Sequence, residues 1–137
     1  MKQITIISQS ENETIELGLK LASILPSGVV VLLCGDLGAG KTTLVRGIAK
    51  GLHIKEVVQS PTFNIMKIYF KGDRPLIHID AYRLADIDTD IGLDEYIGYA
   101  YNFLVYCISS ANFLARTSKL SFCSKEAFTV WRGLFST

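Results

Sequence analysis

Residues 35–43, which read GDLGAGKTT, constrain the fold more than any other stretch of the chain. Three glycines fall within six positions, and a lysine and two threonines follow directly. The stretch matches the phosphate-binding pattern G-x-x-x-x-G-K-[ST], the P-loop, in full. Because such a loop presents backbone N–H groups to an anion at the start of a helix, it requires a strand before it and a helix after it.

The segments on either side of the loop have the required patterns. Residues 28–34 (GVVVLLC) are a continuous apolar run, which predicts a strand covered on both faces. Residues 41–52 have helical spacing, and Gly51 is the predicted stop of that helix. The alternative interpretation is a glycine-rich turn that only joins the two elements.

The rest of the first half continues the alternation of strands and helices. The further predicted elements are an edge strand at residues 2–8, a helix from a capping box at Ser10 and Glu13 to Pro26, strands at 63–70 and 75–80, and a short acidic helix from residue 86. This alternation predicts an α/β fold with a mostly parallel sheet flanked by helices.

Each residue type in the loop suits a phosphate ligand. Glycines lack a Cβ atom, so they allow positive φ angles and a close approach of N–H groups. Lys41 would reach the β- and γ-phosphates, the Thr42 hydroxyl would bind magnesium, and Thr43 would bond on the α-phosphate side. We therefore predict a nucleoside triphosphate site formed by the loop glycines Gly35, Gly38 and Gly40 together with Lys41, Thr42 and Thr43.

A carboxylate is expected near such a site to hold the metal. Asp80 ends the apolar stretch PLIHID, which places it at the end of a predicted strand, in the position of a Walker B aspartate. An aspartate that only caps the following turn is the alternative. His78 points to the same face as Asp80 by alternation, and we interpret it as a packed, hydrogen-bonded residue rather than a general base.

The segment SPTF (residues 60–63) lies between the loop helix and the next predicted strand. Thr62 is a candidate to present its hydroxyl to the γ-phosphate or to the metal. Taken alone, the segment is better explained as a Ser-Pro turn that leads into a strand.

Composition limits the remaining choices. The chain has 137 residues, 49% of them apolar and 20% charged, as expected for one globular domain. A net charge of +1 gives no electrostatic case for DNA or a membrane surface, and the basic residues before residue 98 do not cluster with aromatic ones. Three cysteines without a CxxC spacing, and a start without a secretory pattern, predict a cytoplasmic protein with isolated thiols.

Several spaced motifs together resemble one family. GDLGAGKTTLVRGIAKGL, SPTFN and HIDAYRL resemble the TsaE family (older name YjeE), which comprises small bacterial ATPases that act with TsaB and TsaD in making threonylcarbamoyladenosine at position 37 of tRNA. ENETIELGLKLA and GLDEY fit the same family in the same order. The resemblance covers about residues 3–97, roughly 70% of the chain.

The resemblance implies specific roles for residues of this chain. It implies a P-loop ATPase with ATP and Mg²⁺ as cofactors, acting with the TsaB–TsaD complex and meeting tRNA only indirectly. Lys41 and Asp80 would be catalytic, and Thr42 and Asp80 would bind the metal. The residues implied to hold the phosphates are Gly38, Ala39, Gly40, Lys41, Thr42 and Thr43. SPTF, with Thr62, would be a switch-like segment. Ser10 and Glu11 would contact the base or ribose, although a helix cap explains Ser10 equally well.

The match ends near residue 97, so we predict an ATPase domain at residues 1–97 and a divergent, atypical or truncated tail at 98–137. Residues 1–97 carry 10 basic and 12 acidic residues, whereas the tail carries four basic residues and one acid. In the family, the strand after GLDEY ends in a Glu-Trp pair whose glutamate completes the magnesium and water environment, and this chain has no Glu-Trp. A reading-frame shift or sequence error, or a genuinely divergent tail, are the two hypotheses.

Three other interpretations stay open. A nucleotide or small-molecule kinase shares the P-loop, and a catalytically inactive nucleotide-binding remnant would lack turnover. Residues 96–115 carry no charge, but their Asn, Ser and Tyr content makes them too polar for a membrane span, so we expect no membrane insertion.

Overall fold

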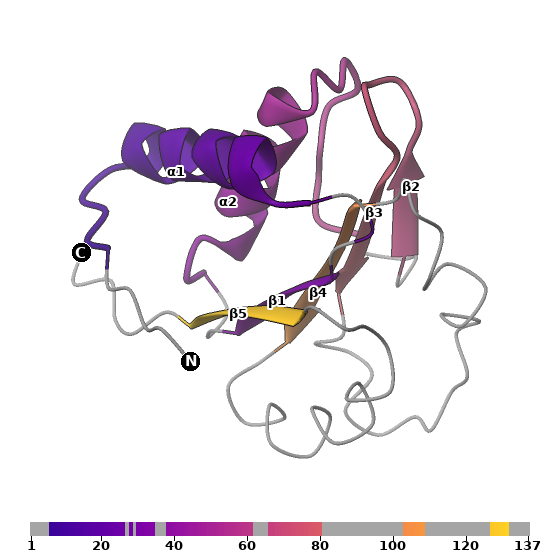
Figure 1. Ribbon diagram of the computed structural model, residues 1–137. Coiled ribbons are helices and arrows are strands. Elements are labelled where there is room, and N and C mark those ends of the chain that lie inside the picture. The colour runs from indigo at the N-terminus through magenta and orange to yellow at the C-terminus, as the bar shows by residue number, and fades with distance from the viewer. Residues whose placement is uncertain are drawn as a thin grey trace.

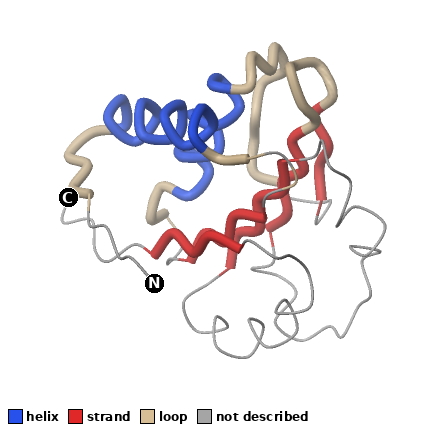
Figure 2. Tube along the Cα trace, viewed as in Figure 1, coloured by secondary structure: helices blue, strands red, loops and turns tan. Residues whose placement is uncertain are grey.

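The computed structural model describes residues 6–26, 28, 30–34, 38–61, 66–80, 103–108 and 127–131. These residues form, in chain order, α1 (Glu11–Ile24), β1 (Val30–Cys34), α2 (Lys41–Gly51), β2 (Met66–Tyr69), β3 (Leu76–Asp80), β4 (Phe103–Ile108) and β5 (Ala127–Trp131). The two helices lie on the same side of the strands (Figures 1 and 2). The α/β class predicted from the sequence is therefore confirmed.

The strands form one sheet in the order β2-β3-β4-β1-β5. β1 pairs in parallel with β4 on one side and with β5 on the other, β3 pairs in parallel with β4, and β2 pairs antiparallel with β3. The carboxyl ends of β1, β3 and β4 consequently lie at the same edge of the sheet. In the register, Asp80 is level with Cys107, and Cys34 is level with Ile108.

α1 begins where the sequence places its capping box. The Ser10 side chain accepts a hydrogen bond from the Glu13 backbone N–H at 3.1 Å, and Glu13 in turn accepts one from the Gln9 N–H at 2.7 Å. Glu13 therefore reaches back to the residue before the cap rather than to the cap itself. The bond to Ser10 satisfies a donor that the helix start leaves without an intrahelical partner, and the bond to Glu13 fixes the residue before the cap.

α1 packs along α2 through glycines, which lets the two backbones approach closely. A Cβ atom at Gly18 would lie 2.8 Å from the Cα of Gly47 and from the backbone nitrogen of Ile48. A Cβ at Gly51 would lie 2.6 Å from the Cβ of Ala22. The position of α2 relative to α1 is thus set by backbone contact rather than by interlocking side chains.

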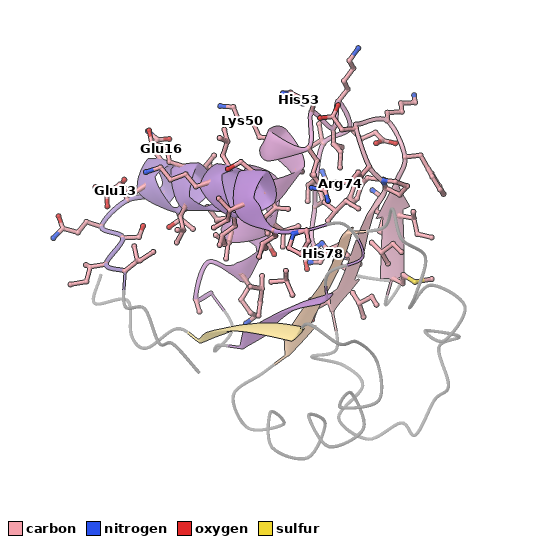
Figure 3. The ribbon with its side chains drawn as sticks, in the orientation of Figure 1. Glu13, Glu16, Lys50, His53, Arg74 and His78 are labelled. Carbon is pink, nitrogen blue, oxygen red and sulfur yellow. The ribbon has the colours of Figure 1, made fainter. Side chains whose placement is uncertain are left out.

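The core lies between the helices and the sheet. The most deeply buried side chains include Val31 of β1, Val45 and Ile48 of α2, and Leu76 of β3. Glu13, Glu16 and Lys50 point away from the sheet on the outer side of the helices (Figure 3). This division buries the apolar face of α2, and the start of this helix lies near Asp80 at the end of β3.

Most of the elements predicted for the described residues are present within a few residues of their expected bounds. The strand predicted at residues 2–8 is wrong for residues 6–8, which are irregular. The Ser8 hydroxyl donates to the Ser10 carbonyl at 3.1 Å, so this segment serves the start of α1 instead of a sheet. Residues 2–5 and the acidic helix predicted from residue 86 lie outside the described residues.

α2 ends at Gly51 as predicted, but the stop has a different cause. The left-handed residue after the helix is His53, with φ of 56°, whereas Gly51 is needed for its close packing against α1. His53 donates its backbone N–H to the Lys50 carbonyl, and its ring lies 2.6 Å from the Asp73 carboxylate. Asp73 also donates its backbone N–H to the Leu52 carbonyl, so the turn after β2 closes over the helix end.

Candidate functional site

The loop before α2 has the backbone conformation that its glycines predict. Gly38 has φ of 78° and Gly40 has φ of 93°, both in the left-handed region that strongly favours glycine. Gly40 is the N-cap of α2, and no side chain caps this helix start. The first turn contains no acidic residue, in contrast to the first turn of α1. Its N–H groups and the positive end of the helix dipole are therefore available to an anion.

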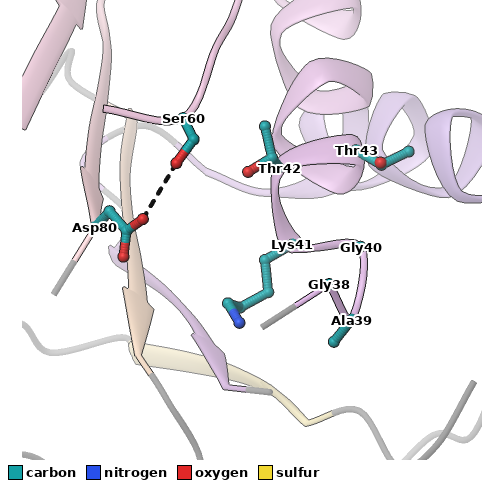
Figure 4. Close-up of a pocket in the computed structure, with 8 residues that line it drawn as sticks. All are labelled: Gly38, Ala39, Gly40, Lys41, Thr42, Thr43, Ser60 and Asp80. Carbon is teal, nitrogen blue, oxygen red and sulfur yellow. Dashed lines mark hydrogen bonds between the residues drawn. The ribbon is translucent and has the colours of Figure 1, made fainter. Parts of the chain in front are cut away.

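A pocket of about 230 Å³ lies at this helix start (Figure 4). It is lined by Gly38, Ala39, Gly40, Lys41, Thr42, Thr43, Ser60 and Asp80. The structure thus brings the six loop residues predicted for phosphates together with the aspartate predicted for the metal. Thr42 turns its hydroxyl toward the side of the pocket where Asp80 lies, and Thr43 lies on the other side of the helix turn (Figure 4).

Asp80 reaches the pocket because of the sheet topology. It is the last residue of β3, and one strand, β4, separates β3 from β1, which leads into the loop. Since β1, β4 and β3 are parallel, the end of β3 and the end of β1 face the same space. The Ser60 hydroxyl donates a hydrogen bond to Oδ2 of Asp80 at 3.2 Å (Figure 4).

Ser60 is a pocket residue that sequence reasoning did not single out. The prediction for SPTF named Thr62, which lies outside the described residues. Ser60 is half-buried and comes to the pocket through the segment after α2, where Val58 and Pro61 are buried. The only signal for Ser60 in the sequence was its place in the SPTF motif. A serine hydroxyl can donate a hydrogen bond to a nearby carboxylate, as Ser60 does to Asp80.

His78 lies next to the site without entering it. It is only 1% exposed, and it lies on β3 (Figure 3). Burial lowers the pKa of His78 to about 4, although the negative charge of Asp80 acts in the opposite direction. The prediction that His78 is packed is confirmed, whereas its hydrogen bonding stays a prediction. Its imidazole is neutral at pH 7.

Ser10 and Glu11 do not line the pocket. Ser10 caps α1, as described above. The Glu11 carboxylate lies 3.6 Å from Nη1 of Arg46 on α2, with both side chains largely exposed. Arg46 also donates from Nε to the Val58 carbonyl at 3.2 Å. Arg46 therefore connects the start of α1 with the segment that carries Ser60.

The pocket residues fit a magnesium ion that is shared with phosphates. A hydroxyl and a carboxylate, from Thr42 and Asp80, are hard oxygen donors of the kind that Mg²⁺ prefers. Among the described residues there is no group of three or more His, Cys, Asp or Glu side chains arranged for a metal.

A parallel-paired strand, a glycine loop with left-handed residues and a helix start facing an acidic strand end define a P-loop-like α/β protein. Comparison with known families identifies the family within this class. The family model described as "Threonylcarbamoyl adenosine biosynthesis protein TsaE" matches residues 8–126. The chain belongs to the TsaE family, as its motifs predicted.

Individual relatives agree with the family match. The chain is 47% identical over 96 residues to the tRNA threonylcarbamoyladenosine biosynthesis protein TsaE of Bacillus subtilis, covering 70% of this chain and 61% of the relative. It is 52% identical over 83 residues to the protein of the same name from Nostoc, covering 60% and 51%. The chain thus spans between half and two thirds of the length of these curated relatives.

A solved structure shares the fold. The crystal structure of YdiB from Bacillus subtilis superposes with a TM-score of 0.65 at 32% sequence identity, covering 89% of this chain and 70% of that one. In the part of the chain that the structure describes, neither helix is both long and apolar enough to cross a membrane.

Proposed function

We propose that this protein binds ATP with Mg²⁺ in the pocket at the start of α2 and supports threonylcarbamoyladenosine modification of tRNA adenosine 37. One observation supports this most strongly: the loop residues and Asp80, 37 positions apart or more in the sequence, line one pocket. Membership of the TsaE family adds the tRNA modification system. We further propose that the fold is of the P-loop NTPase type and that the protein works in the cytoplasm with TsaB and TsaD, meeting tRNA only through them.

Each pocket residue has a role in this proposal. The N–H groups of the loop and the Lys41 ammonium hold the phosphates and stabilise the negative charge that grows on them during hydrolysis. Thr42 and Asp80 hold the magnesium ion, which neutralises charge on the β- and γ-phosphate oxygens when it is bound. Thr43 bonds on the α-phosphate side. Lys41 and Asp80 are the residues we propose as catalytic.

Three further predicted residues keep proposed roles in nucleotide binding. Ser10 and Glu11 are proposed to contact the base or ribose, and Thr62 is proposed to act in a switch-like segment with Ser60. The ion pair between Glu11 and Arg46 places Glu11 beside the helix that carries Lys41 and Thr42. The cap at Ser10 explains that residue without a nucleotide.

We propose that the absence of the family's Glu-Trp pair lowers the rate of ATP hydrolysis more than it lowers the affinity for ATP. The family's Glu-Trp pair is expected at the end of the strand after GLDEY, and β4 is the described strand that follows this motif. β4 reads FLVYCI, so it brings no carboxylate to the edge between β1 and β3. Loss of one carboxylate on the metal side affects turnover more than affinity, because phosphoryl transfer depends on positioned charges. This observation favours an inactive nucleotide-binding protein as the second candidate function.

The proposed boundary at residue 97 separates two parts of the sequence, but the sheet contains strands from both parts. β4 and β5 both lie after residue 97, and both pair with β1. We propose that residues 1–97 carry the nucleotide site and that residues 98–137 have diverged in sequence while they supply these two strands.

Calorimetry with ATP and Mg²⁺, followed by turnover with labelled ATP, tests the proposal. We expect heat of binding from the folded protein, and phosphate released to water when TsaB and TsaD are present. Transfer of the phosphoryl group to an acceptor would identify a kinase instead. Binding without turnover in both conditions would identify the inactive form, and absence of binding would refute the nucleotide site.

A further inference from the structure

The segment that carries Ser60 is fixed from two sides before it reaches the pocket. On the helix side, Arg46 of α2 donates from Nε to the Val58 carbonyl at 3.2 Å. On the sheet side, the Tyr69 hydroxyl of β2 accepts from the Gln59 backbone N–H at 3.2 Å and donates to the Gln59 carbonyl at 3.3 Å. One phenolic group thus satisfies both backbone polar groups of the residue just before Ser60.

Tyr69 is buried in the core, so the hydroxyl that bonds to Gln59 is held in a fixed position. The residue is 1% exposed and is among the largest fully buried side chains. Its ring packs in the core cluster, and it is paired with Leu76 across β2 and β3. A buried tyrosine hydroxyl needs hydrogen-bond partners, and here the partners are the main chain of Gln59.

Ser60, the residue after Gln59, links this fixed backbone to Asp80 in the pocket. Ser60 donates its hydroxyl hydrogen to Oδ2 of Asp80 at 3.2 Å. A hydrogen bond to one carboxylate oxygen restricts rotation of the whole group and selects one orientation of the other oxygen. Tyr69 and Asp80 lie on different strands and are linked through the backbone of Gln59 and the side chain of Ser60.

We propose that Tyr69 and Ser60 are positioning residues that hold the Asp80 carboxylate in place for the magnesium ion of the bound nucleotide. This inference rests on the proposed function, because it takes Asp80 as the metal-side carboxylate. Neither residue needs to touch the metal. Their effect is to remove the entropy cost of ordering Asp80 when the ion arrives.

The test compares nucleotide affinity with Mg²⁺ and with the metal chelated, by calorimetry with a non-hydrolysable ATP analogue. In Ser60→Ala and Tyr69→Phe, the gain in affinity that Mg²⁺ provides should fall by roughly threefold to tenfold, the scale of one net hydrogen bond. Affinity without the metal should stay at the wild-type value. Ser60→Thr keeps a hydroxyl and should retain most of the gain.

Ser23→Ala is the matched control, since the Ser23 hydroxyl bonds only to the Lys20 carbonyl on the exposed side of α1. Thermal unfolding of each variant shows whether it is folded, and Ser60→Ala serves as the test by itself if Tyr69→Phe is not. A full magnesium gain in Ser60→Ala overturns the inference, and a full gain in Tyr69→Phe alone overturns the part that concerns Tyr69.

Asp80→Asn separates this inference from the proposed function. If the wild type shows no magnesium gain, or Asp80→Asn keeps all of it, the role of Asp80 is wrong and the inference is wrong with it. If Asp80→Asn loses the gain while both positioning variants keep it, only the inference is wrong.

Discussion

Gly47 of α2 lies directly against the main chain of Ile15 of α1. A Cβ atom at residue 47 would lie 2.9 Å from both the Cα and the carbonyl carbon of Ile15, closer than real Cβ atoms approach. Because the obstacle is backbone, it cannot move aside as a flexible side chain would. The helix that begins at the loop is therefore held at a distance that only glycine permits.

The first prediction concerns this contact. Gly47→Ala should lower the free energy of unfolding by about 1–3 kcal/mol, because overpacking outweighs the gain of roughly 1 kcal/mol that alanine brings to a helix interior. Denaturant unfolding measures the change. Lys50→Ala, at an exposed position of the same helix, should change stability by no more than about 0.5 kcal/mol. An alanine at 47 that stabilises the protein would contradict the packing described.

The second prediction concerns the lysine of the loop. Lys41→Ala should weaken ATP binding by roughly tenfold to a hundredfold, the scale of a charge-assisted hydrogen bond to phosphate. Calorimetry checks this against Lys50→Ala, which removes the same charge from the other end of α2. Equal losses in the two variants would mean that net charge, rather than the loop, governs binding.

The third prediction separates the two explanations of Ser10. Ser10→Ala removes the cap of α1 and should cost about 1 kcal/mol of unfolding free energy, while Ser23→Ala should cost much less. If Ser10 also contacts the nucleotide, ATP affinity should fall beyond what the stability change explains. Unchanged affinity in a destabilised variant would assign the residue to the helix alone.

The fourth prediction concerns acid stability. The pKa of His78 is about 4 in the folded protein, against an ordinary value of 6.5, because burial disfavours its charged form. Between these two values the unfolded chain binds a proton that the folded chain does not. The free energy of unfolding should therefore fall as pH decreases from 6.5 to 4, by at most about 3 kcal/mol from this residue.

His78→Leu tests this assignment, because the variant cannot titrate at position 78. Denaturant unfolding at several pH values should show a shallower loss in the variant than in the wild type over that interval. Carboxylates contribute to both curves, so the difference between them isolates His78. Parallel curves would show that another group causes the acid sensitivity.

Much of the site was predictable because it depends on local sequence. The left-handed angles at Gly38 and Gly40, the helix start at Lys41 and the strand end at Asp80 follow from residue types and short-range patterns. Ser60 was not singled out, because its role depends on a contact with β3 across 20 positions of sequence. A short-range sequence pattern cannot predict a contact between residues so far apart in the sequence.

Two other predictions about the fold were changed by contacts with α1. Gly51 was expected to stop α2 through a glycine turn, but its lack of a side chain serves the contact with α1, and His53 takes the left-handed position. The pattern of residues 2–8 predicts a strand, yet residues 6–8 are irregular and Ser8 bonds to the Ser10 carbonyl at the start of α1. The Gly51 contact joins residues far apart in the sequence, whereas Ser8 serves the start of the helix that follows it directly.

The placement of β1 has a consequence for the whole chain. Both of its neighbours come from beyond residue 97, so the strand that leads into the loop has no partner in the first 97 residues of this sheet. Edges of β1 and β3 laid bare by removing that region would invite pairing with other molecules. The strand that leads into the glycine loop is thus held on both sides by later segments of the chain, so a substitution that weakens β4 or β5 should also weaken the support of the loop.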